Sequence, residues 1–297
     1  MLKITVPASS ANLGAGFDAL GLALTLYNRV WMEEADGCHI ESADDVPIPT
    51  DESNLIYHTA RLLYERCGRP FHGLHIRQEN HIPMARGLGS SSACLVAGLL
   101  GANTLLGSPL APEDVADLAA ELEGHPDNVA PALLGGLVTA VMDGGRVHTV
   151  SVPVSERIRF AVFIPDFELK TETARAALPG HVTRQDAVYN LSRAALMTAS
   201  LFSGSLQNLR VAVQDRLHQP YRFPMIPGVE PVFYTAYELG AYAVAISGAG
   251  PSVLAILDRD NTTFPSLAED ALARAGLTGW MVRIFDCANK GAEVAFD

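Results

Sequence analysis

The sequence is organised around one loop, which reads Pro83-Met84-Ala85-Arg86-Gly87-Leu88-Gly89-Ser90-Ser91-Ser92-Ala93. A strand-like run precedes the loop, with Leu74 and Ile76 alternating with polar residues, and an almost wholly apolar segment, residues 93–105, follows it. The pattern predicts a strand, then a loop rich in Gly and Ser, then a buried helix.

This loop has the chemistry of a phosphate site. Gly87 and Gly89 admit backbone angles that other residues resist, and they let a ligand approach the chain closely. Residues 90–92 place free amides and hydroxyls at the start of a helix, where N–H donors and the helix dipole both favour a phosphate. A capped helix after a flexible turn explains the same residues equally well, so the rest of the chain has to separate the two interpretations.

The composition fits a globular protein with a sizeable core. The chain has 297 residues, which suits two domains or one large domain, and 48% of them are hydrophobic. Its most apolar run is interrupted by Gly98, Gly101 and Asn103, so no membrane span is expected. The first residues read as a strand and lack the apolar core of a signal peptide.

Charge, cysteine and lysine content narrow the functional classes. The formal net charge is −12 and no basic run stands out, so neither nucleic acid nor an anionic membrane is expected as a partner. The four cysteines are scattered and form no Cys-x-x-Cys pair, as expected for reduced thiols in a cytosolic protein. The three lysines are Lys3, Lys170 and Lys290, and none follows a Gly-rich loop, which excludes a standard P-loop NTPase.

Local patterns place several elements in the first half of the chain. Pro112 begins a helix whose apolar residues recur at helical spacing until Gly124. Residues 54–67 are predicted to form a helix capped by Ser53. Two strand-like runs joined by a turn are expected to pair, and these are residues 30–33 and 38–41.

The second half mixes strands and helices in a similar way. Strands are expected over 160–164, 242–246, 253–257 and 280–285, and helices over 186–203 and 264–274. Because the two kinds of element mix without strict alternation, we predict α+β layers rather than a doubly wound sheet. The expected domains are residues 1–153 and 154–297.

Three Gly-rich loops follow one another along the chain, at residues 7–18, 83–93 and 247–252. Together they resemble the loops of the GHMP kinases, the family named for galactokinase, homoserine kinase, mevalonate kinase and phosphomevalonate kinase. The middle loop matches the family's P-x-x-x-G-L-G-S-S-x-A signature, and the last is similar to its C-terminal glycine motif. Residues 7–21 and 123–132 resemble the homoserine kinases in particular.

The resemblance implies both a fold and an activity. The implied fold has two α+β domains, the first like that of a small-subunit ribosomal protein and the second ferredoxin-like, with ATP in the cleft between them. The implied activity is phosphorylation of the side-chain hydroxyl of L-homoserine to O-phospho-L-homoserine by ATP and Mg²⁺, in threonine biosynthesis. Homoserine kinases are commonly dimers, so a cytoplasmic homodimer is expected.

L-homoserine carries an ammonium, a carboxylate and a primary hydroxyl, and each of them needs a partner. By resemblance Asn12 and Asp18 hold the amino-acid end, with Asp18 facing the ammonium; both residue types are equally typical of a tight Asx turn. Arg175 and Arg222 are assigned to the carboxylate, which a guanidinium fork binds in bidentate fashion. Thr171 adds a hydroxyl contact.

The resemblance also assigns His125 and Asn128 to the substrate. The two share one face if their segment is helical, and the alternative for His125 is a cap on the preceding helix. Asn128 and Glu123 are the implied catalytic residues. Asp127 is expected to point elsewhere and no dedicated base is evident, so catalysis is expected to come from positioning and charge neutralisation.

The remaining implied contacts concern ATP and the metal. The ATP residues are all those from Pro83 to Ala93, together with Asn54 near the adenine. Mg²⁺ prefers hard oxygen ligands, and the implied ligands are Ser91 and Glu123, with Glu121 as a rival. Residues 247–252 contact phosphate, shape the pocket wall, or simply form a tight turn between strands.

Overall fold

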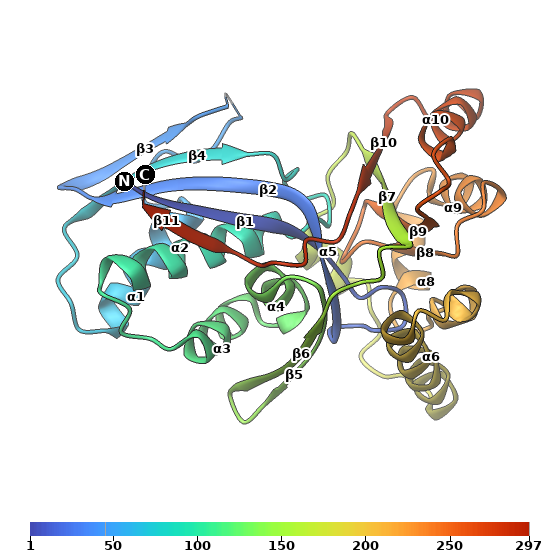
Figure 1. Cartoon of the computed structure of the whole chain (residues 1–297), viewed down its shortest axis with the longest axis horizontal. Coiled ribbons are helices and arrows are strands. Elements are labelled where there is room, and N and C mark those ends of the chain that lie inside the picture. The colour runs from blue at the N-terminus through green and yellow to red at the C-terminus, as the bar shows by residue number, and fades with distance from the viewer. Residues whose placement is uncertain (45, 297) are drawn as a thin grey trace.

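The computed structural model describes residues 1–44 and 46–296 and distributes their strands between two sheets. Figure 1 shows the first sheet and α1–α4 in one half of the molecule, and the second sheet with α6, α8, α9 and α10 in the other half. The mixture of packed helices and antiparallel strands confirms the predicted α+β class.

The first sheet has seven strands in the order β11-β1-β2-β4-β3, with β5 attached to β2 and β6 attached to β5. Its strands are Leu2–Ala11 (β1), Leu20–Glu34 (β2), Gly37–Ser42 (β3), Gly73–Asn80 (β4), Leu137–Asp143 (β5), Arg146–Val152 (β6) and Glu293–Phe296 (β11). Its helices are Leu55–Arg66 (α1), Ser90–Leu105 (α2), Pro112–Glu123 (α3) and Pro126–Leu134 (α4).

The second sheet has four antiparallel strands in the order β10-β7-β9-β8. They are Ile158–Pro165 (β7), Ala243–Ile246 (β8), Val253–Asp258 (β9) and Trp280–Phe285 (β10). The helices of this half are Thr171–Ala176 (α5), Arg184–Ser203 (α6), Leu209–Ala212 (α7), Gln219–Arg222 (α8), Val229–Glu238 (α9) and Phe264–Arg274 (α10), with single 3₁₀ turns at Leu206–Asn208 and Phe223–Met225.

The chain passes from one sheet to the other between β6 and β7, where the expected boundary after residue 153 falls. The last strand does not stay with the second sheet. β11 returns to pair with β1, from Leu2 opposite Phe296 to Thr5 opposite Glu293. The end of the expected second domain is therefore part of the first sheet.

Helix α2 is buried on nearly every side, which explains why its sequence is apolar throughout. It packs against α1, β1 and β2, and two of its glycines permit the close approach to α1 and β2. A Cβ at Gly98 would lie 2.7 Å from the carbonyl oxygen of Ile56, and one at Gly101 would lie 2.7 Å from the sulfur of Met32. Burial of each large apolar side chain, such as Leu99, stabilises the fold by about 1.5–3 kcal/mol.

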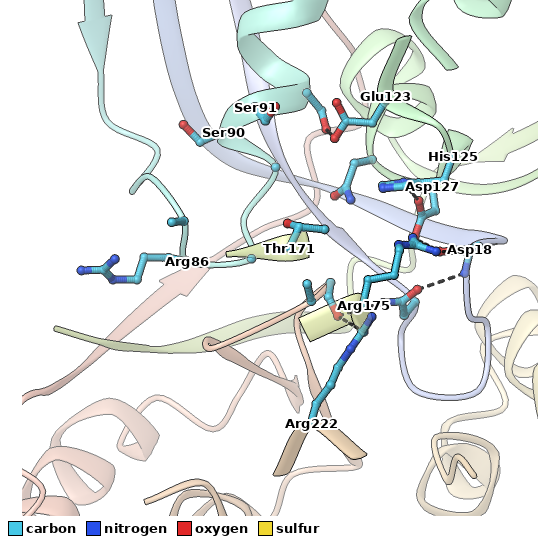
Figure 2. Close-up of a pocket in the computed structure, with 18 residues that line it drawn as sticks. Asp18, Arg86, Ser90, Ser91, Glu123, His125, Asp127, Thr171, Arg175 and Arg222 are labelled. Carbon is cyan, nitrogen blue, oxygen red and sulfur yellow. Dashed lines mark hydrogen bonds and ion pairs between the residues drawn. The ribbon is translucent and has the colours of Figure 1, made fainter. Parts of the chain in front are cut away.

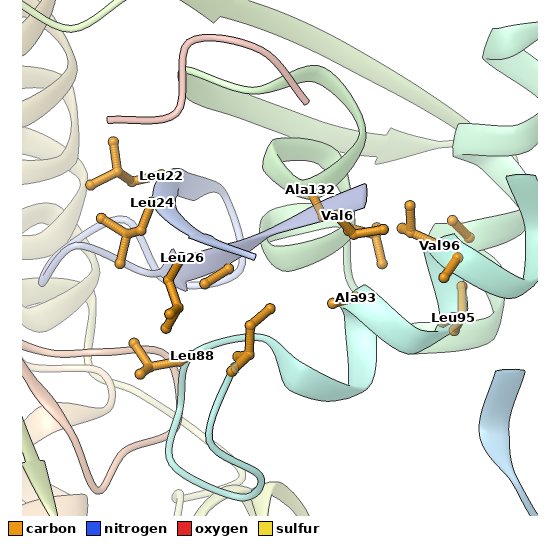
Figure 3. Close-up of a cluster of buried hydrophobic side chains, with 14 of the residues drawn as sticks. Val6, Leu22, Leu24, Leu26, Leu88, Ala93, Leu95, Val96 and Ala132 are labelled. Carbon is orange, nitrogen blue, oxygen red and sulfur yellow. The ribbon is translucent and has the colours of Figure 1, made fainter. Parts of the chain in front are cut away.

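The central loop is anchored in this same core through Leu88. Figure 3 shows Leu88 in one cluster with Leu26 of β2 and Ala93 of α2. Leu88 is only 1% exposed, although its neighbours in the loop are polar or lack side chains. The sheet therefore holds the loop by a hydrophobic contact as well as by backbone hydrogen bonds, including that from Ser9 N to Leu88 O, at 3.1 Å.

The expected pairing of residues 30–33 with residues 38–41 is wrong. β2 and β3 are joined by a short turn, but β4 lies between them and pairs antiparallel with β2 and parallel with β3. A turn between two strand-like runs predicts a hairpin only if no third strand competes for the same edge, and a local pattern carries no information about that competitor.

Several local predictions are confirmed, and others need correction. Helix 112–123 ends at Gly124, whose φ is 88°, as predicted, and α10 and β10 also have the predicted bounds. Residues 7–11, expected in a loop, complete β1 instead. The cap of α1 is Asn54 rather than Ser53. Neither α5 nor β11 was expected, because each is short.

None of the helices in residues 1–44 and 46–296 is long and apolar enough to cross a membrane.

Candidate active site

One pocket lies where the two halves of the molecule meet, and it collects most of the predicted site residues. Those that do not line it are Asn54, Pro83, Met84, Leu88 and Ala93. Figure 2 shows its lining side chains converging from loops and helix ends of both halves. Its lining residues are Asn12, Asp18, Ala85, Arg86, Gly87, Gly89, Ser90, Ser91, Ser92, Glu123, His125, Asp127, Asn128, Thr171, Arg175, Arg222, Gly248 and Ala249.

The end of the pocket that suits a phosphate is the N-terminus of α2. Gly89 occupies the N-cap position with φ of 70°, and within the described part of the chain no side chain caps the helix. The first backbone N–H groups of α2 are therefore available to an anion, and the helix dipole favours one. A Cβ at Gly89 would lie 2.1 Å from Ser9 Oγ, so this position requires glycine.

Arg86, which the sequence placed among the ATP contacts, lines the pocket, but its guanidinium donates hydrogen bonds to backbone carbonyls of the protein. Its Nε donates to the carbonyl of Pro165 at 2.9 Å, and its Nη2 donates to that of Asp166 at 2.7 Å. Figure 2 shows the guanidinium turned away from the other pocket residues. Arg86 thus ties the loop to the end of β7 in the other half of the molecule.

Residues 247–252 form a wall of the pocket, and they are also the connection between β8 and β9. The Ser247 hydroxyl donates to the carbonyl of Gly87 at 2.6 Å, which fixes the central loop from the side. The carbonyl of Gly248 accepts hydrogen bonds from Asn12 Nδ2 at 2.8 Å and from Arg222 Nη1 at 3.0 Å. One turn therefore organises both ends of the pocket.

Oxygen atoms suited to a hard cation lie beside the start of α2. Glu123 Oε1 accepts a hydrogen bond from the Ser92 hydroxyl at 2.8 Å, and Ser91 lines the same part of the pocket. A carboxylate and hydroxyls next to a phosphate site fit Mg²⁺, which takes few protein oxygens and completes its shell with phosphate and water. The rival Glu121 pairs instead with Arg66 on the exposed surface.

Asp127 lines the pocket, so the expectation that it points elsewhere is wrong. It lies in the first turn of α4, is 2% exposed, and receives a hydrogen bond from His125 Nδ1 at 2.6 Å. Burial lowers the pKa of His125, but the hydrogen bond and charge of Asp127 outweigh it, and the pKa is raised. Pro126 is typical of the first position of a helix, so the sequence does contain a signal that Asp127 lies in a first helical turn. Side chains in a helix lean toward its N-terminus, which here is the side of the pocket.

Asn128 and His125 have different structural roles from one another. His125 occupies the N-cap position of α4, not the cap of the preceding helix, and its side chain makes no capping bond to a described residue. Asn128 Oδ1 accepts a hydrogen bond from the Ser9 hydroxyl at 2.9 Å, which fixes the amide in the pocket. Both side chains therefore face the cavity from the same short helix.

Asp18 and Arg175, predicted to hold the ammonium and the carboxylate of the substrate, are paired with each other. Arg175 Nη2 and Nη1 lie 2.8 and 2.9 Å from the two carboxylate oxygens of Asp18, and the pair is partly exposed. This hydrogen-bonded carboxylate raises the pKa of Arg175. Asp18 has φ of 53°, a conformation held in part by its N–H bond to Asn12 Oδ1 at 3.0 Å.

Arg222 is the deepest charge in the pocket. It is 1% exposed, and both of its hydrogen bonds to described residues use Nη1, to His218 Nδ1 and Gly248 O, each at 3.0 Å. Its Nε is buried without a hydrogen-bond partner among the described residues. Burial and the nearby Arg175 lower the pKa of Arg222 to about 10. A buried guanidinium with an unsatisfied edge favours an anionic ligand.

The predicted contact of Asn54 with adenine finds no support in the structure. Asn54 is 2% exposed and does not line the pocket. Its Oδ1 accepts from Ile56 N at 3.0 Å, and its Nδ2 donates to Gln78 Oε1 at 2.6 Å and to Pro49 O at 2.9 Å. All of these side-chain hydrogen bonds are made within the protein, and they include the N-cap of α1.

Comparisons with known proteins point to one family. The profile of the GHMP kinases N-terminal domain matches residues 54–136, and that of the GHMP kinases C-terminal domain matches residues 195–263. A homoserine kinase of Caldicellulosiruptor bescii is 44% identical over 297 residues, covering 99% of this chain and 97% of the relative. One of Moorella thermoacetica is 43% identical and is covered over 100% of its length, with 99% of this chain.

Solved structures of homoserine kinases are also similar to this chain. A homoserine kinase from Cytophaga hutchinsonii superposes with a TM-score of 0.86 at 29% identity, over 99% of this chain and 97% of the other. A putative homoserine kinase from Listeria monocytogenes gives a TM-score of 0.82 at 36% identity over 100% of both chains. A galactokinase from Lactococcus lactis, at 12% identity, shares the fold with a TM-score of 0.75, over 98% of this chain and 95% of the other.

Proposed function

The chain belongs to the homoserine kinases of the GHMP kinase family, and from that premise we propose that it phosphorylates the side-chain hydroxyl of L-homoserine with ATP. The product is O-phospho-L-homoserine, which serves threonine biosynthesis. In the reaction the hydroxyl oxygen forms a bond to the γ-phosphorus, the bond from that phosphorus to the departing ADP oxygen breaks, and the hydroxyl proton is released.

The observation that carries the proposal is the buried, incompletely paired guanidinium of Arg222. A charge that is 1% exposed is costly unless an anion reaches it, and the carboxylate of an amino acid supplies that anion. Nε and Nη2 form one edge of the guanidinium, and neither atom makes a hydrogen bond to a described residue, since both protein contacts use Nη1.

The ion pair of Asp18 and Arg175 gives the second half of amino-acid recognition. A zwitterion offers Asp18 an ammonium and offers Arg175 a carboxylate, so it replaces each partner with an equivalent one. Each charged group therefore still has a partner of opposite charge after the substrate binds. Both groups are partly exposed, so water can solvate them while the partners exchange. Asn12 fixes this loop, and Thr171 adds a hydroxyl at the start of α5.

The chain's other residues position the reacting groups. The amides of α2 hold the phosphates, with Ser91 and Glu123 as the ligands of Mg²⁺, which supplies positive charge to the phosphate oxygens. Asn128, fixed by Ser9, orients the substrate hydroxyl toward the phosphate end. Phosphoryl transfer passes through a loose transition state, so orientation and charge neutralisation account for most of the catalysis.

A substrate panel tests the function. ADP release, measured with a coupled assay, is compared for L-homoserine, mevalonate, galactose and shikimate at equal concentrations. We expect turnover with homoserine far above the other three. Turnover of another substrate with homoserine inert would show the assignment to be wrong, and ATP binding without any phosphoryl transfer would instead favour a regulatory role for the fold.

The homodimer, the cytoplasmic location and the domain boundary after residue 153 also remain proposals. The homodimer is proposed because homoserine kinases are commonly dimers. Sedimentation equilibrium tests it directly, because a monomer of 31.7 kDa and a dimer of twice that mass are well separated.

A further inference from the structure

His218 is completely buried and does not line the pocket, yet it contacts two elements that build the amino-acid end. It precedes α8 and is 0% exposed. Its Nε2 lies 2.8 Å from the carbonyl oxygen of Gly14, and its Nδ1 lies 3.0 Å from Arg222 Nη1. Its ring stacks on Phe17, with ring centroids 5.1 Å apart and an angle of 20° between the planes.

These contacts require one tautomer of the imidazole. A carbonyl oxygen only accepts, so Nε2 carries the proton toward Gly14, and a guanidinium only donates, so Nδ1 presents a lone pair to Arg222. Asp215 Oδ2 lies 3.6 Å from Nε2, too far for a hydrogen bond, and it accepts instead from the backbone N–H of His218 at 2.9 Å. Burial lowers the pKa of His218, which keeps the ring neutral.

The orientation of Arg222 depends on this lone pair. Nη1 has two N–H groups, and one is aimed at His218 Nδ1 and the other at the carbonyl of Gly248. Two acceptors on one nitrogen fix the plane of the guanidinium, because the group is rigid. They leave the edge formed by Nε and Nη2 directed away from these contacts. Without the Nδ1 acceptor, rotation about the side-chain bonds is limited only by Gly248 and packing.

We propose that His218 is a positioning residue for substrate recognition, which holds Arg222 as a carboxylate receptor and joins it to the loop of residues 12–18. The proposal rests on the function assigned above. It predicts that His218 acts on substrates with a carboxylate, and far less on ATP or on a substrate analogue that lacks this group.

Two substitutions separate the two hydrogen bonds of the ring. In His218→Asn the amide oxygen takes the place of Nδ1 and can accept from Arg222, whereas the contact with Gly14 is lost. In His218→Gln the amide nitrogen takes the place of Nε2 and can donate to Gly14, whereas the acceptor beside Arg222 is lost. Both variants shorten or reshape the same buried side chain, so each serves as the packing control of the other.

The assay compares L-homoserine with 3-aminopropan-1-ol, which is homoserine without its carboxylate. For His218→Gln we expect the KM for homoserine to rise about 10- to 100-fold, while the KM for ATP and kcat/KM for aminopropanol change less than about threefold. His218→Asn is expected to recover most of the homoserine KM. Thermal unfolding of both variants reports their folded state.

Three outcomes would overturn the inference. Equal losses for both variants, with ATP and aminopropanol affected alike, would show that His218 only supports packing. A loss confined to His218→Asn would assign the effect to Gly14 instead. Unchanged kinetics in both variants would show that Arg222 needs no support. Wild-type protein that does not use homoserine would contradict the proposed function itself, which distinguishes the two failures.

Discussion

The two ends of the pocket are built in opposite ways. The proposed phosphate end comes from one continuous stretch, residues 83–93, and it offers backbone amides and hydroxyls at the start of α2. The proposed amino-acid end comes from separate segments in both halves of the molecule, and it is lined by charged side chains such as Asp18, Arg175 and Arg222. One end is a local structure, and the other exists only in the folded chain.

This difference has a chemical reason. A phosphate carries spread negative charge that several amides can share, so glycine conformation and a helix terminus suffice. An amino acid carries two opposite charges at fixed separation, and it needs an acidic and a basic group placed at matching positions. Such placement is obtained from rigid elements on either side of a cleft, as shown here by α5, α8 and the loop of residues 12–18.

The largest expected effect is at Arg222. Replacement by Met keeps an unbranched side chain but removes the carboxylate partner, so kcat/KM for homoserine should fall about 100- to 1,000-fold, as for loss of one partner of a buried charged pair. The KM for ATP should change little if the two ends are independent. Arg222→Lys is the matched control, and it should restore little because a lysine lacks the planar fork. An equal loss of ATP affinity would contradict the independence of the two ends of the pocket.

The next effect tests the phosphate end. Glu123→Gln removes a negative oxygen ligand of the proposed magnesium site but keeps the side-chain volume, so kcat should fall about 10- to 100-fold. The loss should be partly recovered by raising the Mg²⁺ concentration, as measured by steady-state kinetics. Glu121→Gln is the matched control on the same helix and should leave both kcat and the Mg²⁺ dependence unchanged, because Glu121 pairs with Arg66.

Asp18→Asn tests recognition of the ammonium. The substitution removes the charge that both Arg175 and the substrate ammonium use, so the KM for homoserine should rise about tenfold, consistent with a partly exposed charged hydrogen bond. The KM for ATP should stay within about twofold of the wild-type value, because the removed charge is assigned to the amino acid and not to ATP. If both constants rise together, Asp18 shapes the whole pocket rather than its amino-acid end.

A smaller effect is expected from Gly87→Ala. Gly87 has φ of 71°, and a Cβ there would lie 2.3 Å from the carbonyl oxygen of Ser247, so the substitution strains the contact between two loops. We expect the free energy of unfolding to fall by about 1–3 kcal/mol, together with a several-fold rise in the KM for ATP. Denaturant titration and ATP kinetics measure the two effects. A neutral result would show that the loops can shift apart without cost.

The smallest effect concerns pH and the pair of His125 and Asp127. The folded-state pKa of His125 is raised above the ordinary value of 6.5, so the stability contributed by the pair is present below that value. It is lost as the pH rises through the folded-state pKa. The free energy of unfolding of wild type relative to Asp127→Asn should therefore decrease as the pH increases from the acidic to the alkaline side of this transition. A difference independent of pH would contradict the assignment.

Much of the fold follows from local sequence. Pro112, two acidic residues and Gly124 delimit α3 because caps act within one turn of the chain. Gly144 and Gly145 form the turn between β5 and β6 because both adopt positive φ, at 57° and 81°. The pairing of β3 with β4 and the return of β11 to β1 depend on competition between distant strands, which local patterns do not record.

The candidate site, like the fold, has features that local sequence predicts and features that depend on distant parts of the chain. The sequence alone identifies the loop of residues 83–93 and the residue types that an amino-acid substrate needs, because glycine conformation and side-chain charge are properties of individual positions. Only the tertiary structure shows that the Arg86 side chain turns away, that Asp127 lines the pocket, and that His218 contacts Arg222 from outside the pocket. A side chain's direction and its hydrogen-bond partners depend on elements far apart in the chain, and these come together only when the two sheets pack.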